Sequence, residues 1–201
     1  MSPNQRNRRL RESKAIRALV RENRLSVNDL MLPLFVTDGR QVKEAIHSMP
    51  GIYRISLDLL KEEVKNAWSM GIKAVLIFVK VPDKLKNNTG SEAINPKGLM
   101  QRAVREIKSS VPEILVMTDV ALDPYSSHGH DGIVEKKKVL NDPTLEILSQ
   151  MALSHAKAGA DFVAPSDMMD GRVLSIRAAL EEAGLHSIGI MSYSAKYASA
   201  F

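Results

Sequence analysis

The sequence predicts an α/β fold organised around parallel β-strands. Short apolar runs rich in Val, Ile and Leu alternate along the chain with longer segments of helical periodicity, which is the pattern of strand–helix–strand units. The runs lack polar alternation, so each strand is expected to be covered on both faces, as in a barrel or a doubly wound sheet. The expected strands are residues 29–36, 73–79, 114–120, 161–165 and 188–192.

Three segments between these runs have the apolar spacing of a helix with one buried face. They are residues 56–70, 142–158 and 170–184. Gly71, Gly159 and Gly184 stand where helices commonly end, and Asn141 with Pro143 resembles a helix start. The residues expected to face the core are Leu60, Val64, Ala67, Trp68, Leu148, Met151, Ala152, His155, Val173, Ile176, Ala179, Leu180 and Ala183.

The number of strands favours one of the two sheet types. A (β/α)₈ TIM barrel has eight strands and typically ~250 residues, and its strands are covered on both faces. No Gly-x-Gly-x-x-Gly sequence follows the first run, so the fingerprint of a dinucleotide-binding sheet is missing. We expect about the first five strand–helix units of a TIM barrel. Residues 28–201 would form this partial catalytic domain and residues 1–27 an N-terminal arm, with an open five-stranded sheet as the alternative.

Composition narrows the class of protein. With 44% hydrophobic and 25% charged residues, the chain has the balance of a globular domain. No apolar run is long enough for a membrane span, and the N-terminus lacks the apolar core of a secretory signal. The absence of cysteine excludes disulfides and thiolate metal sites. We expect a soluble, cytoplasmic protein with no membrane partner.

The basic charge is concentrated in the first 24 residues. These hold eight Arg and Lys against two Glu, a net charge of +6, whereas the rest of the chain holds 20 basic and 21 acidic residues, a net charge of −1. Such an arm can bind nucleic acid, contact an acidic neighbouring subunit or lie in solvent. Because it has no aromatic residues for base stacking and no nucleic-acid motif, we expect no nucleic-acid partner.

Polar side chains stand where the last three expected strands end. Asp119 stands near the end of the third strand, Ser166 and Asp167 follow the fourth, and Tyr193 and Lys196 follow the fifth. The carboxyl ends of barrel strands hold the active site, so these residues should converge on one rim. Partial desolvation would disfavour the ammonium form of Lys196 and leave a free amine that can attack a ketone. The alternative is an ordinary solvated lysine.

The loop over residues 119–132 is the second polar cluster. Asp119, Asp123, His128, His130 and Asp131 could together ligate a metal ion through imidazole and carboxylate groups. Alternatively, its proline and glycines form turns and the polar side chains face water. Carboxylate ligands favour hard ions such as Mg²⁺, and spacing alone leaves both interpretations open.

Four stretches of the sequence resemble one family. They read RNRRLR (6–11), MTDVALDPYSSHGHDG (117–132), AGADFVAPSDMMDGRV (158–173) and MSYSAKYASAF (191–201). Together they resemble the porphobilinogen synthase family, also called delta-aminolevulinic acid dehydratase, in order from about Arg6 to Phe201. The resemblance implies a TIM-barrel lyase that condenses two 5-aminolevulinate molecules to porphobilinogen in tetrapyrrole (heme) biosynthesis.

The resemblance also implies site residues. Lys196 matches a Schiff-base lysine of the family, and Asp119 matches an active-site acid, so these two are the expected catalytic residues. Ser166, Tyr193, Asp123 and Asp131 are the expected substrate-pocket residues. A second family lysine, in a VKP-like motif, has no counterpart here, and neither has the YGPFR arginine that meets the substrate carboxylate. The chain alone is therefore expected to be inactive.

Ions, partners and alternatives follow from the same resemblance. Zinc-using relatives carry three cysteines at the positions of Ala121, Asp123 and Asp131, so no active-site zinc is expected here. An allosteric Mg²⁺, with its glutamate ligand outside these residues, and a K⁺ near the active site are the ions expected instead. The basic arm is expected to join subunits of a homo-octamer. The alternative functions are an inactive fragment of this enzyme and a single-lysine, aldolase-like lyase.

Overall fold

The computed structural model describes residues 4–195, and its sheet is parallel at the centre. Five parallel strands follow one another across the sheet in chain order, and a helix precedes each strand after the first. They are β1 (Met31–Thr37), β4 (Ala74–Lys80), β5 (Leu115–Val120), β8 (Phe162–Pro165) and β9 (Gly189–Ile190). The five expected strands are thus confirmed, and each boundary agrees within about two residues, the usual uncertainty of element ends.

The order of the strands distinguishes the two sheet types. A doubly wound sheet reverses its strand order at a switch point, whereas these five strands proceed in one direction, as they do around a barrel wall. The wall is not closed.

Two short hairpins were not expected from the sequence: β2 (Lys43–Ala45) with β3 (Tyr53–Ile55), which borders β1, and β6 (Ile133–Glu135) with β7 (Lys138–Leu140).

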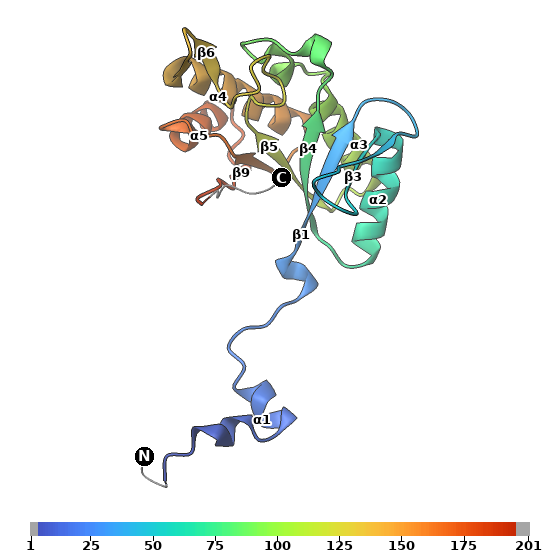
Figure 1. Ribbon diagram of the computed structural model, residues 1–201, viewed down its shortest axis with the longest axis vertical. Coiled ribbons are helices and arrows are strands. Elements are labelled where there is room, and N and C mark those ends of the chain that lie inside the picture. The colour runs from blue at the N-terminus through green and yellow to red at the C-terminus, as the bar shows by residue number, and fades with distance from the viewer. Residues whose placement is uncertain (1–3, 196–201) are drawn as a thin grey trace.

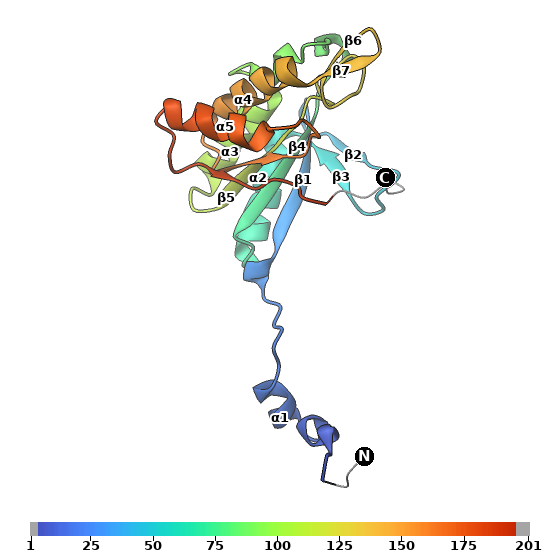
Figure 2. The same cartoon turned by 90° about the vertical axis from the view of Figure 1, so that its left-hand side faces the viewer.

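Four helices cover one face of the sheet (Figure 2). They are α2 (Leu57–Ser69), α3 (Leu99–Ser110), α4 (Asn141–Ala158) and α5 (Arg172–Glu182). Helix α3 is an addition to the expected elements. Among residues 4–195, no helix combines the length and the apolar character needed to cross a bilayer.

Two details of the expected helices need correction. Asn141 is the first residue of α4 and Leu140 occupies the cap position, so Asn141 does not cap the helix. In α5 only Ile176 and Leu180 are buried, while Val173 is exposed. The buried stripe of α5 is therefore narrower than its apolar spacing suggested.

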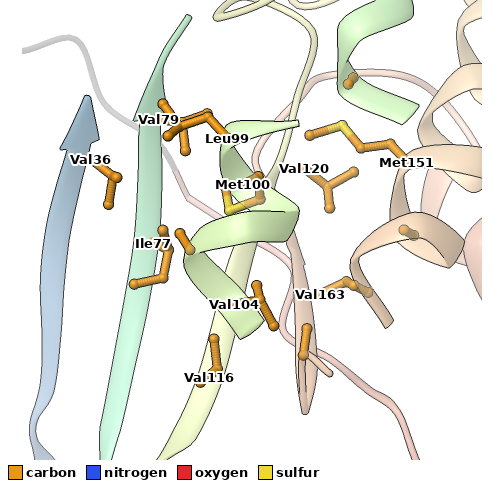
Figure 3. Packing of buried hydrophobic residues seen from close by; sticks show 14 of the residues in the cluster. Val36, Ile77, Val79, Leu99, Met100, Val104, Val116, Val120, Met151 and Val163 are labelled. Carbon is orange, nitrogen blue, oxygen red and sulfur yellow. The ribbon is translucent and has the colours of Figure 1, made fainter. Parts of the chain in front are cut away.

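Alternate residues of each strand face opposite sides of the sheet. One set packs under the helices in the main core, as Figure 3 shows for Val36, Ile77, Val116 and Val163. The opposite set forms a smaller apolar cluster of Leu76, Met117 and Ala164, against which Phe78, Phe162 and Tyr193 pack. No helix residue belongs to this second cluster among the described residues, so this face remains available to line a cavity.

The N-terminal segment leads away from the sheet (Figures 1 and 2). It contains a 3₁₀ turn (Asn7–Arg11), the short helix α1 (Lys14–Leu19) and a second 3₁₀ turn (Val27–Asp29), none of which buries a residue. Leu10, Leu19 and Leu25 are exposed along it. The division between arm and barrel at residue 27 stays a prediction.

A half-buried ion pair between Lys108 and Asp161 ties α3 to two strands. The ammonium Nζ of Lys108 lies 2.7 Å from Oδ2 of Asp161 and donates to the carbonyl of Ile114 at 2.9 Å. The same Asp161 oxygen accepts the backbone N–H of Val116 at 2.7 Å. Because Asp161 immediately precedes β8, these contacts fix the starts of β5 and β8 against each other.

The turn of the β6–β7 hairpin is expected to be a point of strain. Lys136 and Lys137 connect the strands with φ of 49° and 63°, a left-handed conformation that side chains with a Cβ disfavour. Replacing them by Asn-Gly should raise the free energy of unfolding by about 1 kcal/mol. The urea midpoint of the double variant, at unchanged m-value, measures the gain.

Lys138→Gln is the control that separates relief of charge repulsion from relief of backbone strain. It removes a lysine from β7 at a position where the backbone is not left-handed. We expect little change from Lys138→Gln. A midpoint that rises equally in both variants would mean that relief of charge repulsion, and not backbone strain, stabilises the hairpin.

Candidate active site

A cavity of about 440 Å³ opens beside the carboxyl ends of β1, β4, β5 and β8. Four residues expected from the sequence line it: Asp119, Asp123, Ser166 and Tyr193. They meet because parallel strands end at the same edge of the sheet. The structure thus brings these side chains into one cavity, while their individual roles stay predictions.

Other expected residues lie elsewhere. Asp131, in the loop before β6, is not among the residues that line the cavity, and its negative charge helps to raise the pKa of Asp167. Asp167 is itself buried and does not line the cavity, and its Oδ1 accepts the N–H of Met169 at 2.7 Å. Burial is the main cause of its raised pKa. Lys196 lies outside the described residues.

Asp119 is supported from the helix side of the sheet. The neighbouring Thr118 points under the helices, where its hydroxyl lies 3.0 Å from Nδ1 of His155 and donates to the carbonyl of Phe162 at 3.5 Å. His155 is fully buried, and this burial lowers its pKa to about 3, so the imidazole is neutral. Successive residues of a strand face opposite sides of the sheet, so contacts that hold Thr118 under the helices also keep Asp119 facing the cavity. Asp119 is only 7% exposed.

Tyr193 is placed by backbone contacts. Its N–H donates to the carbonyl of Pro165 at 3.1 Å, which continues the pairing of β8 with β9 past Ile190. The guanidinium of Arg172, at the start of α5, donates to the carbonyl of Tyr193 at 3.4 Å. Burial, and then the negative charge of Asp119, raise the pKa of the Tyr193 hydroxyl. This phenol therefore remains a hydrogen-bond donor at neutral pH.

The cavity also contains cationic residues that sequence reasoning missed. Arg54 on β3, Lys80 at the end of β4 and Lys86 line it together with the aromatic rings of Phe35 and Phe78. Lys80 could have been found, because it ends a buried strand at the edge where chemistry is expected. Arg54 could not, since the three-residue strand that holds it is too short to show alternation.

The loop over residues 119–132 does not form a metal centre with its neighbours. Within residues 4–195, no three His, Asp or Glu side chains come together in an arrangement that could hold a metal ion. The alternative of a turn-rich loop fits better, since Ser126 accepts the N–H of His128 at 3.1 Å and Gly129 has a φ of 62°. The magnesium and potassium ions expected from the sequence stay predictions.

Comparison with known proteins establishes the family. The family model described as delta-aminolevulinic acid dehydratase matches residues 4–201. The chain belongs to the delta-aminolevulinic acid dehydratase family. It is 52% identical over 199 residues to the delta-aminolevulinic acid dehydratase of Methanothermus sociabilis and 47% identical over 196 residues to that of Bacillus subtilis. These alignments cover 99% and 98% of this chain, and 61% and 60% of the two relatives.

A solved structure of the family supports the fold. The delta-aminolevulinic acid dehydratase of Toxoplasma gondii ME49, in complex with its reaction product porphobilinogen, superposes with a TM-score of 0.92 at 48% identity. The match covers 96% of this chain and 55% of that one. The open sheet is accordingly part of a TIM barrel, as the sequence predicted. The chain spans about 60% of the length of the two curated relatives named above.

Replacing His155 by glutamine is expected to reduce the pH dependence of stability. The folded chain holds the pKa of His155 at about 3, whereas the unfolded chain takes up this proton below about pH 6.5. The extra proton is bound by the unfolded state, so the free energy of unfolding decreases as the pH falls from about 6.5 towards 3. Between pH 7 and pH 5 this group accounts for a loss of about 2 kcal/mol, which urea titrations at both pH values can measure.

The matched control is His128→Gln, which removes an exposed histidine from the loop before β6. It should leave the difference between pH 7 and pH 5 close to that of the wild type. If His155→Gln loses as much stability on acidification as the wild type does, the imidazole is not kept neutral by folding.

Proposed function

We propose that this chain provides the part of a porphobilinogen synthase in which Lys196 forms a Schiff base with 5-aminolevulinate. The observation that supports this most directly is the cavity in which Asp119, Ser166 and Tyr193 meet. Tyr193 is only three residues before Lys196 in the chain. The Toxoplasma gondii relative was solved with porphobilinogen, which supports 5-aminolevulinate as the substrate. The overall reaction joins two substrate molecules and releases two molecules of water.

The proposed first step requires only groups of this chain and the substrate. The neutral amine of Lys196 adds to the C4 ketone, and a proton moves from nitrogen to oxygen to give a carbinolamine. A second proton transfer to that hydroxyl lets water leave, and the imine forms. The imine acidifies the adjacent carbon, so that a carbon–carbon bond to the second molecule can form.

The cavity residues have distinct parts in this proposal. The Asp119 carboxylate accepts and returns protons at the reacting end, which requires its place on the cavity side of β5. The hydroxyls of Ser166 and Tyr193 donate hydrogen bonds to oxygen atoms of the substrate. Tyr193 suits this because its raised pKa keeps its proton in place. Asp123 contributes negative charge beside the substrate amine.

Assembly and ions belong to the same proposal. The basic arm, with a net charge of +6 and exposed leucines, would contact an acidic surface of another subunit, in line with a homo-octamer. An allosteric Mg²⁺ would bind through ligands outside these residues, and zinc is not proposed because the cysteines it would need are absent. We place the protein in the cytoplasm, with tetrapyrrole biosynthesis as its pathway.

Borohydride trapping with 5-aminolevulinate tests the proposal. We expect a reduced adduct on the peptide that contains Lys196, identified by mass spectrometry, and no adduct in Lys196→Ala. The second family lysine has no counterpart in the chain, so porphobilinogen should not accumulate in a colorimetric assay without borohydride. Adduct formation spread over surface lysines, or retained in Lys196→Ala, would contradict the assignment.

Asp119→Asn should slow adduct formation at Lys196 by at least about tenfold, because an amide cannot exchange the protons that imine formation needs. The same change removes a negative charge near Tyr193, so the pKa of that phenol should fall, which ultraviolet titration can follow. Asp142→Asn, at an exposed position of α4, is the control and should change neither quantity. An unaltered trapping rate in Asp119→Asn would exclude Asp119 from the proton transfers.

A further inference from the structure

Two loops contribute to one wall of the cavity. The β4–α3 loop (residues 81–98) supplies Lys86, and the β5–β6 loop (residues 121–132) supplies Asp123. Both loops lie at the end of the sheet opposite the N-terminal arm (Figures 1 and 2). Because Asp123 stands on a loop and not on a strand, the pairing of the sheet does not fix its position. The contacts between the two loops must do so.

The backbones of the two loops pair at Asn87. Its N–H donates to the carbonyl of Tyr125 at 3.1 Å, and its carbonyl accepts the N–H of Ser127 at 3.2 Å. Asp123 is two residues before Tyr125, so this pairing limits how far Asp123 can move. The side chain of Asn87 serves its own loop, where its Oδ1 accepts the N–H of Ser91 at 3.1 Å.

The next residue, Asn88, joins the loops through its side chain. Its Nδ2 donates to the carbonyl of Val134 at 2.9 Å, and its Oδ1 accepts the N–H of Val134 at 3.0 Å. An amide group presents a donor and an acceptor in one plane, as the backbone of a strand does. Asn88 therefore pairs with β6 in the way that a third strand would.

The β6–β7 hairpin depends on such contacts. It forms a two-stranded sheet that is separate from the main sheet, and a hairpin of this size has little stability by itself. Asn88 attaches β6 to the β4–α3 loop, and the hydroxyl of Thr144 in α4 accepts the N–H of Ile133 at 3.0 Å. Since β6 directly follows the β5–β6 loop, Asn88 fixes the far end of that loop while Asn87 fixes its middle.

We propose that Asn88 is a positioning residue of the active site. By pairing with Val134 it holds the β5–β6 loop against the β4–α3 loop, and so keeps Asp123 beside the amino group of 5-aminolevulinate. Asn88 acts through Asp123 and does not itself line the cavity. Asp119 lies on the central strand β5 and is held independently of this contact. The inference rests on the proposed function, because it takes 5-aminolevulinate as the ligand and the adduct on Lys196 as the readout.

The test separates binding of the substrate from the chemical step. The rate at which borohydride traps the adduct on Lys196 is measured by mass spectrometry over a range of 5-aminolevulinate concentrations. In Asn88→Ala the half-maximal concentration should rise about fivefold, because Asp123 moves away from the amine. The maximal trapping rate should stay within about twofold of the wild type, which is the pattern of a lost binding contact.

A double-mutant cycle shows whether Asn88 acts through Asp123. Asp123→Asn alone should raise the half-maximal concentration about tenfold, since a hydrogen bond between two charged groups is lost. In the Asp123→Asn background, Asn88→Ala should add less than about twofold, because both changes affect the same contact. A general loss of stability would instead multiply the two effects.

Two further variants complete the experiment. Asn88→Asp keeps the size of the side chain and the acceptor for the Val134 N–H, but its carboxylate repels the Val134 carbonyl. It should raise the half-maximal concentration by about fivefold as well, and it decides the matter if Asn88→Ala proves poorly folded by circular dichroism. Asn66→Ala, at an exposed position of α2 outside the cavity, is the matched control and should change neither quantity.

The outcomes separate the two proposals. Absence of any Lys196 adduct in the wild type overturns the proposed function, and this inference with it. An adduct in the wild type whose half-maximal concentration is unchanged in Asn88→Ala and Asn88→Asp overturns the inference alone. Multiplied effects of Asn88→Ala and Asp123→Asn also overturn it, since Asn88 would then support the fold and not the position of Asp123.

Discussion

The side of the sheet that each strand residue faces is the constraint on which the rest of the structure depends. Val116 packs under the helices, whereas Asp119, three residues later on the same strand, faces the cavity. A slip of β5 by one residue would exchange the two faces along the whole strand. It would place the Asp119 carboxylate in the apolar core, where an unpaired charge is very unfavourable. The packing of the helices therefore fixes the register that forms the site.

Polar contacts on the far side of the sheet keep the site residues in place. His155 holds Thr118 next to Asp119, and the Lys108–Asp161 pair aligns the starts of β5 and β8. Arg172 holds the segment of Tyr193 in place through its hydrogen bond to the Tyr193 carbonyl. None of Thr118, His155 and Lys108 lines the cavity. Such residues act on the chemistry only through the position of others, which is why their spacing in the sequence gives no functional signal.

How far the sequence predicts this structure depends on the length of each element. Buried strands of six or seven residues, such as β4 and β5, show an apolar run that periodicity detects, and so Asp119 at a strand end could be predicted. Helix α3 has an equally clear stripe, but its N-cap residue is Gly98, which has no side chain to cap the helix and mark its start. The three-residue strands β2 and β3 show no period at all, and the pairing that brings Arg54 beside Phe35 exists only after folding.

The two ends of the cavity differ in rigidity because they lie on strands of different length and position in the sheet. Asp119 lies on a central strand, paired on both sides and backed by a buried histidine, so its position is strongly determined. Arg54 lies on a short strand near the sheet edge, held to Glu44 by one long contact, and such elements open at low free-energy cost. Packing on both faces and pairing on both sides fix the register of a central strand, so the acid of the cavity is held more firmly than its cation.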